Sequence, residues 1–210
     1  MKDREPLVFV VDDDKSVRIS LSHLLESDGY SVESFVSAAE YLACKPYPGP
    51  ACLILDVLLP DLDGLTLQRE LEEQGRTEQI VFITGHGDIP TGVRAMKRGA
   101  VDFLAKPFRD DELLGAVSQA LSRSAENWHR QDEVAQIRAR IATLTHREFQ
   151  VFRLVIAGSL NKQIAAELGA ALRTTKTHRG RVMHKLGVES VADLVRLAEK
   201  AGVDPVRFGT

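Results

Sequence analysis

The sequence predicts an α/β domain followed by an all-helical domain. Apolar runs alternate with amphipathic segments five times before residue 123, which predicts a doubly wound, five-stranded parallel sheet with helices on both faces. After residue 144 only segments with helical periodicity follow. A charged stretch without Pro or Gly connects the two parts. We therefore expect domains at residues 1–122 and 144–210, joined by a helical linker at 123–143.

The strands of the first domain are expected where short apolar runs end at turn residues, and its helices where apolar residues recur every three or four positions. We expect strands at 7–12, 31–35, 51–56, 79–83 and 101–105, and helices at 15–28, 37–44, 64–74, 89–98 and 110–122. Asp14 is placed to cap the first helix, because its side chain can accept a hydrogen bond from a free backbone N–H.

The second domain begins with a capping box formed by Thr145 and Glu148. We expect helices at 146–157, 161–168, 172–186 and 190–200, most of them ended by glycine. The second and third of these are joined by a tight turn that contains Gly169, which is typical of a helix-turn-helix module.

The linker carries an apolar pattern of its own. Val134, Ile137, Ile141 and Leu144 follow one another at spacings of three, four and three. This spacing suits a short coiled-coil seam between two chains. It suits equally a single amphipathic helix that packs on its own domain, and the sequence leaves both interpretations open.

Composition and charge limit the classes of function. The chain is 44% hydrophobic, and no stretch approaches a membrane span or resembles a signal peptide, so we expect a soluble, cytoplasmic protein. The net charge of −3 is unevenly divided. Residues 146–210 carry 11 Lys and Arg against 6 Asp and Glu, or +5, which leaves 16 against 24, or −8, for residues 1–145. An acidic domain joined to one that can meet a polyanion is therefore expected.

Polar residues stand at the ends of the predicted strands: Asp12, Asp13, Asp56, Thr84 and Lys106. Because the carboxyl ends of parallel strands lie along one edge, these side chains are expected to meet there. Three clustered carboxylates are costly without a cation, and oxygen ligands suit Mg²⁺. The sequence thus predicts a site for a divalent cation and a phosphoryl group.

Each residue of this site has an expected role. Asp56 follows the central strand and is the expected nucleophile toward a phosphoryl donor, with Mg²⁺ offsetting the charge during transfer. Lys106 is expected to pair with the acyl phosphate. Thr84 is expected to swing its hydroxyl toward a phosphoryl oxygen and to move its loop.

Residues 1–122 resemble a CheY-like receiver domain. The matching blocks are Val11-Asp12-Asp13, Leu55-Asp56, Pro60-Asp61-Leu62-Asp63-Gly64, Ile83-Thr84-Gly85-His86-Gly87-Asp88 and Lys106-Pro107-Phe108. The resemblance implies phosphorylation of Asp56 by a sensor histidine kinase. It also implies Mg²⁺ bound by Asp13, Asp56 and the backbone carbonyl of Leu58, with Asp12 acting through water, and a cis Lys106-Pro107 bond.

Two further positions allow two interpretations each. Phe103 falls where the family keeps an aromatic residue that turns inward on activation, and a buried core Phe is the alternative. His86 lies in a Gly-His-Gly loop, where we expect a residue at the rim of the site rather than a catalytic histidine. With Leu58 it is a candidate for tuning the access of water.

Residues 144–202 resemble a LuxR-type helix-turn-helix domain. The matching residues include Leu144-Thr145, Arg147-Glu148, Gly158, Asn161-Lys162-Gln163-Ile164-Ala165, Leu168-Gly169, Arg173-Thr174, Lys176, His178-Arg179, Val182-Met183, Lys185-Leu186 and Ala192-Asp193-Leu194-Val195-Arg196. Together with the receiver this resembles a response regulator of the FixJ/NarL type.

Helix 172–186 is the expected recognition helix. Its inward face is formed by Thr175, Val182, Met183 and Leu186. The expected DNA contacts are Asn161, Lys162, Arg173, Lys176, Thr177, Gly180 and Arg181. Three positions depart from the family pattern, of which Ala170 replaces a larger aliphatic residue. Ala171 replaces the usual Ser N-cap, at a cost of about 1 kcal/mol, and Thr175 replaces a buried Val, so its hydroxyl is expected to bond a carbonyl one turn earlier.

The combined pattern predicts a phosphorylation-switched transcription factor rather than an enzyme. The expected partners are a sensor histidine kinase, double-stranded DNA, RNA polymerase and a second copy of the chain. Activation is expected either to pair receivers through helix 89–98 and strand 101–105 or to release the recognition helix. The last helix, 190–200, is a further candidate for a dimer contact. Two rivals are a metal-dependent phosphohydrolase built on Asp56 and an interaction protein that binds no nucleic acid.

Overall fold

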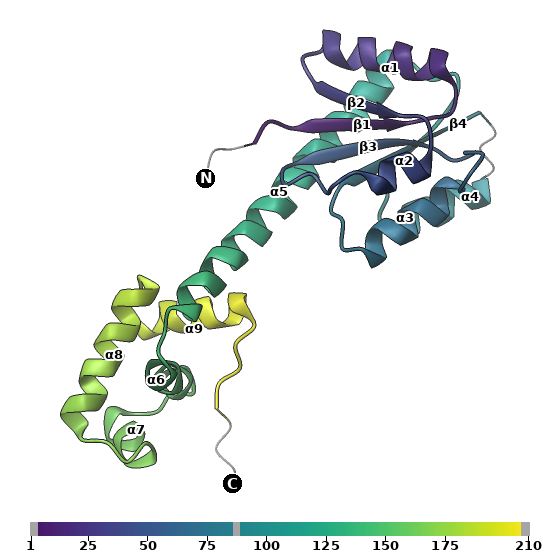
Figure 1. Cartoon of the computed structure of the whole chain (residues 1–210). Helices are drawn as coiled ribbons and strands as arrows, with labels where there is room; N and C mark the ends of the chain where they lie inside the picture. The colour runs from purple at the N-terminus through teal and green to yellow at the C-terminus, as the bar shows by residue number, and fades with distance from the viewer. Residues whose placement is uncertain (1–3, 86–88, 207–210) are drawn as a thin grey trace. The chain divides into compact units, whose positions relative to one another are not determined.

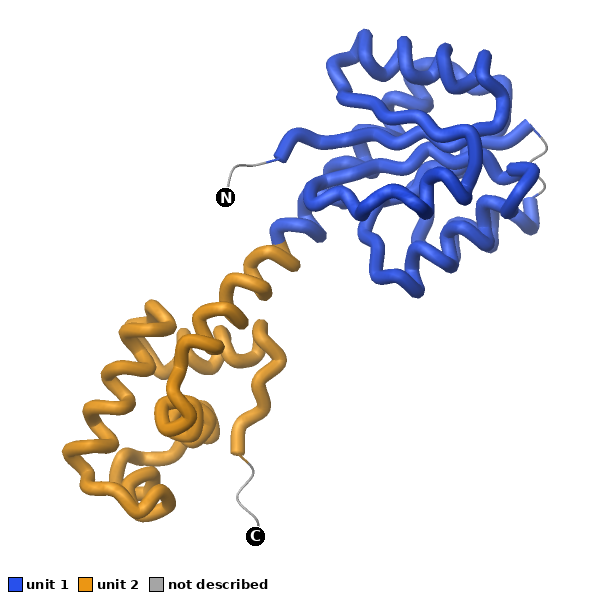
Figure 2. The backbone as a smooth tube through the Cα atoms, in the orientation of Figure 1, with its two compact units in different colours: residues 1–129 blue, residues 130–210 orange. Residues whose placement is uncertain are grey.

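A computed structural model of the chain describes residues 4–85 and 89–206. The chain forms two compact units, residues 1–129 and 130–210 (Figure 2). The boundary falls within one long helix, α5 (Asp110–Ala142), so the helix expected to continue through the linker is present (Figure 1). No helix in the described part of the chain is long and apolar enough to cross a membrane.

The first unit contains a five-stranded, all-parallel sheet, which confirms the predicted fold class. The strand order is β2-β1-β3-β4-β5. The strands are β1 (Leu7–Val11), β2 (Ser31–Phe35), β3 (Ala51–Asp56), β4 (Gln79–Thr84) and β5 (Asp102–Ala105). The helices between them are α1 (Lys15–Ser27), α2 (Ala38–Ala43), α3 (Gly64–Glu73) and α4 (Ile89–Lys97).

Helices cover both faces of the sheet (Figure 1). On one face the core contains Tyr41 of α2, Leu67 of α3 and Ala95 of α4, and on the other it contains Leu25 of α1 and Val117 of α5. Every residue of β1 and β3 is buried, which is why these central strands read as unbroken apolar runs. With both faces covered, the carboxyl edge of the sheet is where a ligand site is expected.

The register of the sheet brings the strand ends together. Val11 pairs with Leu55, Asp56 with Ile83, and Thr84 with Ala105. The residues that follow β1 and β5 therefore lie at the same edge as the last residues of β3 and β4.

A buried ion pair fixes the segment that precedes β4. Arg76 Nη2 lies 2.7 Å from Glu78 Oε1, and the two side chains are 2% and 4% exposed. The Arg76 guanidinium also stacks 4.5 Å from the centre of the Tyr41 ring and donates to the carbonyl of Cys44. Because an unpaired charge in such a place is costly, the pair ties the loop after α2 to the loop after α3.

The second unit is helical, as predicted. It contains α6 (His146–Ile156), α7 (Asn161–Glu167), α8 (Leu172–Leu186) and α9 (Val191–Ala201). Gly187 ends α8 with a φ of 67°, a left-handed conformation that favours glycine. Leu194 and Leu197 of α9 are buried in the core of this unit.

The end of α5 belongs to the core of the second unit. Ile137 is buried in that core, and Ile141 and Leu144 pack against it. Arg138 Nε donates to the carbonyl of Ala201 at the end of α9. Of the two interpretations of the linker pattern, these contacts support the amphipathic helix that packs on its own domain.

Candidate functional site

Three consecutive aspartates follow β1 and lie in different environments. Asp12 is fully buried, and its Oδ1 accepts a hydrogen bond from the backbone N–H of Asp14 at 2.8 Å. Asp14 caps α1, as predicted, by accepting from the N–H of Ser16 at 2.7 Å. Asp13 is exposed. Of the three, only Asp12 is buried.

Arg18 of α1 holds the backbone of this loop. Its Nη1 donates to the carbonyl of Asp12 at 2.7 Å and to that of Asp13 at 2.9 Å. Sequence reasoning missed this role, and the only available signal was an arginine one turn into the helix that follows three aspartates. These two hydrogen bonds fix the backbone from which the Asp12 and Asp13 side chains extend.

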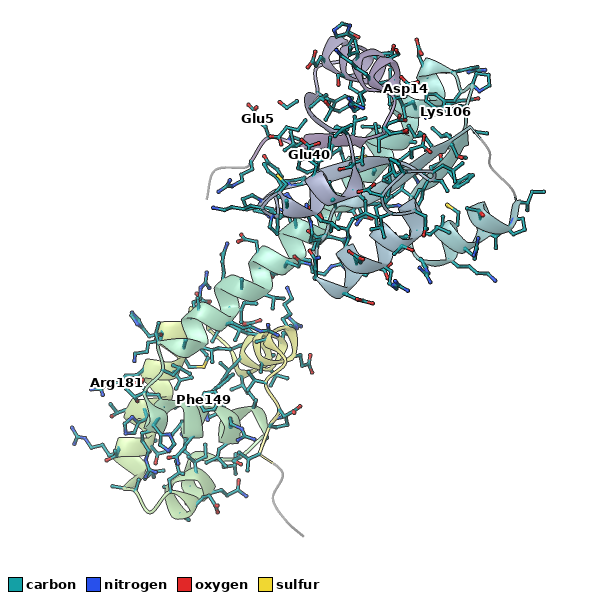
Figure 3. All side chains as sticks on the ribbon, turned by 45° about the vertical axis from the view of Figure 1, so that its right-hand side comes forward. Glu5, Asp14, Glu40, Lys106, Phe149 and Arg181 are labelled. Atoms are coloured by element: carbon teal, nitrogen blue, oxygen red, sulfur yellow. The ribbon has the colours of Figure 1, made fainter. Side chains whose placement is uncertain are left out.

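Lys106 joins the carboxylates of Asp12 and Asp56. Its Nζ lies 2.7 Å from Asp12 Oδ2 and 2.6 Å from Asp56 Oδ2. Burial raises the pKa of Asp12 above its usual value, although the hydrogen bond from Lys106 opposes this. Burial alone would lower the pKa of Lys106, but its bonds to the two carboxylates outweigh burial and raise it. Lys106 lies at the same end of the unit as Asp14 (Figure 3).

The three carboxylates expected at this edge differ in burial and in their partners. Across residues 4–85 and 89–206, no group of three or more His, Cys, Asp or Glu is placed to hold a metal ion. Asp12 and Asp56 share the Lys106 ammonium, while Asp13 faces solvent. The Lys106 ammonium therefore offsets part of the repulsion that the sequence analysis assigned to a bound cation.

The remaining residues of the edge lie around this centre. Asp56 Oδ1 accepts from the N–H of Leu58, whose side chain is 56% exposed. Thr84 is fully buried, and its carbonyl accepts from the N–H of Lys106 at 2.7 Å. The Lys106–Pro107 bond is cis, as the resemblance implies. His86 lies outside the described residues.

Phe103 of β5 is half-buried between the sheet and α4. Its ring centre is 6.2 Å from that of Phe82. A Cβ added to Gly92 of α4 would lie 3.3 Å from the Phe103 ring, closer than most van der Waals contacts. Because Gly92 has no side chain, the Phe103 ring can lie against α4 in this position.

One surface of α4 is apolar and open. Ile89, Val93 and Met96 are 84%, 46% and 45% exposed. They are spaced four and three apart, so they follow one face of the helix. We call these three residues the α4 stripe.

In the second unit, α8 has the two faces that the sequence predicts. Thr175, Val182 and Leu186 are buried and Met183 packs against the core. The residues expected to face DNA on this helix are all exposed: Arg173, Lys176, Thr177, Gly180 and Arg181. Arg181 extends from the outer side of the unit, whereas Phe149 of α6 lies within it (Figure 3).

The start of α8 lacks a side-chain cap, and the Thr175 hydroxyl makes the predicted bond to a carbonyl one turn earlier. Ala171 is the N-cap and provides no side-chain hydrogen bond. The Thr175 hydroxyl donates to the carbonyl of Ala171 at 3.3 Å, as expected for a buried hydroxyl. The start of α7 is joined to α8 by an unpredicted contact, in which Arg179 Nη1 donates to Asn161 Oδ1. Lys162, the next residue of α7, is exposed.

An ion pair with a buried carboxylate joins α6 to α8. Lys185 Nζ lies 2.6 Å from Glu148 Oε2, and the Glu148 side chain is 3% exposed. The same carboxylate accepts from the N–H of Thr145 in the predicted capping box. The hydrogen bond from Lys185 and then that from Thr145 lower the pKa of Glu148 to about 2. This carboxylate is therefore ionised at neutral pH and fixes α8 on α6.

Comparisons with known proteins match both units. Residues 8–118 match the response regulator receiver domain, and residues 142–198 match the luxR family of bacterial regulatory proteins. The chain belongs to the response regulator family.

Relatives extend over nearly the whole response regulator. Nodulation protein W of Bradyrhizobium diazoefficiens is 50% identical over 94% of this chain and 87% of that protein. Transcriptional regulatory protein FixJ of Azorhizobium caulinodans is 43% identical over 97% of this chain and 96% of that protein. The solved structure of response regulator StyR is 47% identical over 94% of this chain and 100% of that chain, with a TM-score of 0.84.

This response regulator is therefore a transcriptional regulator of a two-component system and not an enzyme. Its receiver domain implies a kinase partner, and its LuxR-type domain implies DNA binding. Receivers of this family typically bind Mg²⁺ at the phosphorylation site.

Replacing Lys185 with Met tests the ion pair with Glu148. We expect the pKa of Glu148 to rise from about 2 toward its ordinary value of 4.5, because the ionised form loses its cation. In the parent the folded-state pKa is the lower one, so the stabilisation is complete above pH 4.5 and is lost as the pH falls toward 2. A carboxyl ¹³C NMR titration of the full chain measures the midpoint.

Lys200→Met is the control for this titration, because Lys200 pairs with the half-exposed Glu133. That variant should leave the Glu148 midpoint unchanged. An equal midpoint in the parent and in Lys185→Met would contradict the assigned cause.

Proposed function

We propose that Asp56 accepts a phosphoryl group from a sensor histidine kinase. Asp56 ends β3, between β1 and β4, and its side chain is 11% exposed. The bridge from Lys106 to Asp56 and Asp12 is the observation that carries this proposal. In the transfer, an Asp56 oxygen bonds phosphorus while the bond from phosphorus to the kinase histidine breaks, and the histidine nitrogen keeps the electron pair. Lys106 then pairs with the phosphoryl oxygens.

Mg²⁺ fits the donor set at this edge. Asp13, Asp56 and the carbonyl of Leu58 would hold the ion, with Asp12 acting through water. All are hard oxygen donors of the kind Mg²⁺ prefers, and Arg18 holds the backbone from which the Asp13 side chain extends. When bound, the ion offsets negative charge on the phosphoryl oxygens.

Thr84 and Phe103 pass the change to the surface. The Thr84 hydroxyl moves toward the phosphoryl group and takes the end of β4 with it. Phe103 follows by turning inward from its half-buried position against Gly92, which offers no side chain to oppose the movement. The element displaced is α4.

Phosphorylation pairs two receivers through α4 and β5. The α4 stripe supports pairing because it places three large apolar side chains in solvent on the helix that contacts Phe103 of β5. The pairing brings two DNA-binding units onto half-sites of one operator.

The recognition helix α8 reads double-stranded DNA. Arg173, Lys176 and Arg181 provide cations for phosphates and guanine edges, and Thr177 and Gly180 allow close approach of the helix. Asn161 and Lys162 contact the phosphate backbone beside it. Because a protein that binds bacterial DNA acts where the chromosome is, its proposed location is the cytoplasm. RNA polymerase is a further proposed partner.

Asp56→Asn tests the site of phosphorylation. Full-length protein incubated with acetyl phosphate and Mg²⁺ should gain the mass of one phosphoryl group, and the variant should gain none, because an amide oxygen is a poor nucleophile. Intact-protein mass spectrometry measures this. Asp14→Asn is the matched control, since Asp14 caps α1 and lies outside the Lys106 bridge, and it should still be modified. Equal modification of Asp56→Asn and the parent would refute the assignment.

Val93→Asp tests pairing through α4. The parent treated with beryllofluoride and Mg²⁺ should sediment as a dimer, and the variant should stay monomeric because a carboxylate enters the apolar contact. Val36→Asp is the control, because Val36 is 48% exposed but lies between β2 and α2. Dimers of Val93→Asp as tight as those of the parent would exclude the α4 stripe as the contact.

Lys176→Ala tests the DNA-binding surface. Affinity for an operator selected in vitro should fall, and the slope of log affinity against log salt should decrease by about 0.9, because one phosphate contact is lost. Fluorescence anisotropy over a salt series measures both. Lys200→Ala on α9 is the control and should leave the slope unchanged. If the slope does not respond to Lys176→Ala, Lys176 makes no phosphate contact.

A further inference from the structure

One contact in the helix-turn-helix module fixes the orientation of an amide group. Arg179 of α8 donates a hydrogen bond through Nη1 to Oδ1 of Asn161, the first residue of α7, over 2.9 Å. Both side chains are partly buried. Because a guanidinium carries donors and no acceptor, it can bond only the oxygen of the amide. The contact therefore decides which end of the amide faces α8.

The nitrogen of this amide is turned away from Arg179. The oxygen and the nitrogen of a planar amide diverge from one carbon, so Nδ2 points away when Oδ1 points at the guanidinium. No described residue accepts a hydrogen bond from Asn161 Nδ2. The adjacent Lys162 is exposed, so the free N–H donors lie next to a cation.

The two orientations of an asparagine amide have nearly the same shape but opposite chemistry. With Nδ2 outward the side chain can donate to a phosphate oxygen, whereas with Oδ1 outward it would repel the phosphate. We propose that Arg179 is a positioning residue that holds the Asn161 amide with its nitrogen toward a DNA phosphate, without contacting DNA itself. This inference rests on the proposed phosphate contact of Asn161.

If Arg179 contacted a DNA phosphate directly, the salt dependence of operator affinity would differ. A cation that neutralises a phosphate releases counterions and adds about 0.9 to the slope of log affinity against log salt. A neutral amide donor adds affinity without this release. Arg181, two residues further along α8, is exposed and has no ion-pair partner among the described residues, so it provides the matched comparison.

The experiment measures operator affinity of the full-length protein by fluorescence anisotropy over a salt series, on a duplex selected in vitro by the parent. We expect Arg179→Met and Asn161→Ala each to lower affinity about three- to tenfold, as for one hydrogen bond, with the slope unchanged. The double variant should bind no more weakly than the weaker single variant, because the two act through one contact. Arg181→Met should reduce the slope by about 0.9.

Asn161→Asp separates positioning from folding. The carboxylate keeps an oxygen for Arg179 but replaces the N–H donors with a charged acceptor, so the unit should melt at or above the parent temperature while affinity falls further than in Asn161→Ala. Operator binding by Asn161→Asp equal to that of the parent would overturn the proposal.

The salt series distinguishes the other results that would contradict the proposal. A reduced slope in Arg179→Met, with additive loss in the double variant, would assign Arg179 to a phosphate directly and overturn the positioning role. If Asn161→Ala leaves affinity unchanged while Lys176→Ala and Arg181→Met weaken it, the proposed contact of Asn161 fails. If none of these variants changes affinity, the proposed DNA-binding surface itself is wrong.

Discussion

The Lys106 ammonium, placed between the carboxylates of Asp12 and Asp56, is the interaction on which the first unit depends. Two carboxylates brought to one buried edge repel each other, and burial disfavours their charged form. The cation that offsets this repulsion directly follows β5, a strand that is separated from β3 by β4. The repulsion is therefore offset only when the sheet is complete to its last, four-residue strand. Any added charge on Asp56 changes the partners of Lys106 directly.

The second unit uses the same physical device for a different purpose. The ion pair of Lys185 with the buried Glu148 carboxylate fixes the carboxyl end of α8 on α6, and the bond from Arg179 to Asn161 fixes the middle of α8 on α7. The amino end of α8 lacks a side-chain cap at Ala171, which costs about 1 kcal/mol. Helix α8 is thus held by contacts with α6 and α7 more than by its own first turn.

Much of this architecture could be predicted from the sequence because parallel strands buried on both faces must be apolar, and the polar residue that ends each run marks the edge. Asp56, Thr84 and Lys106 were placed together on that basis. The roles of Arg18 and Arg179 could not be predicted, since a long side chain can reach many partners and only the folded backbone selects one. The exposure of Asp13 could not be predicted either, because adjacent residues of a loop face different ways and only the folded backbone decides which of them is buried.

The direction of the switch follows from what is fixed around Asp56. Asp12 is held by the N–H of Asp14 and by Arg18 at its carbonyl, and the Lys106 backbone is bonded to the Thr84 carbonyl. A phosphoryl group adds negative charge and acceptor oxygens, so a hydrogen-bond donor must move toward it. Under the proposed function that donor is Thr84, and Gly92 lets Phe103 respond. Helix α4 also carries the exposed apolar stripe. Under the proposed function, the helix that moves on phosphorylation is therefore the one that buries this stripe against a second receiver.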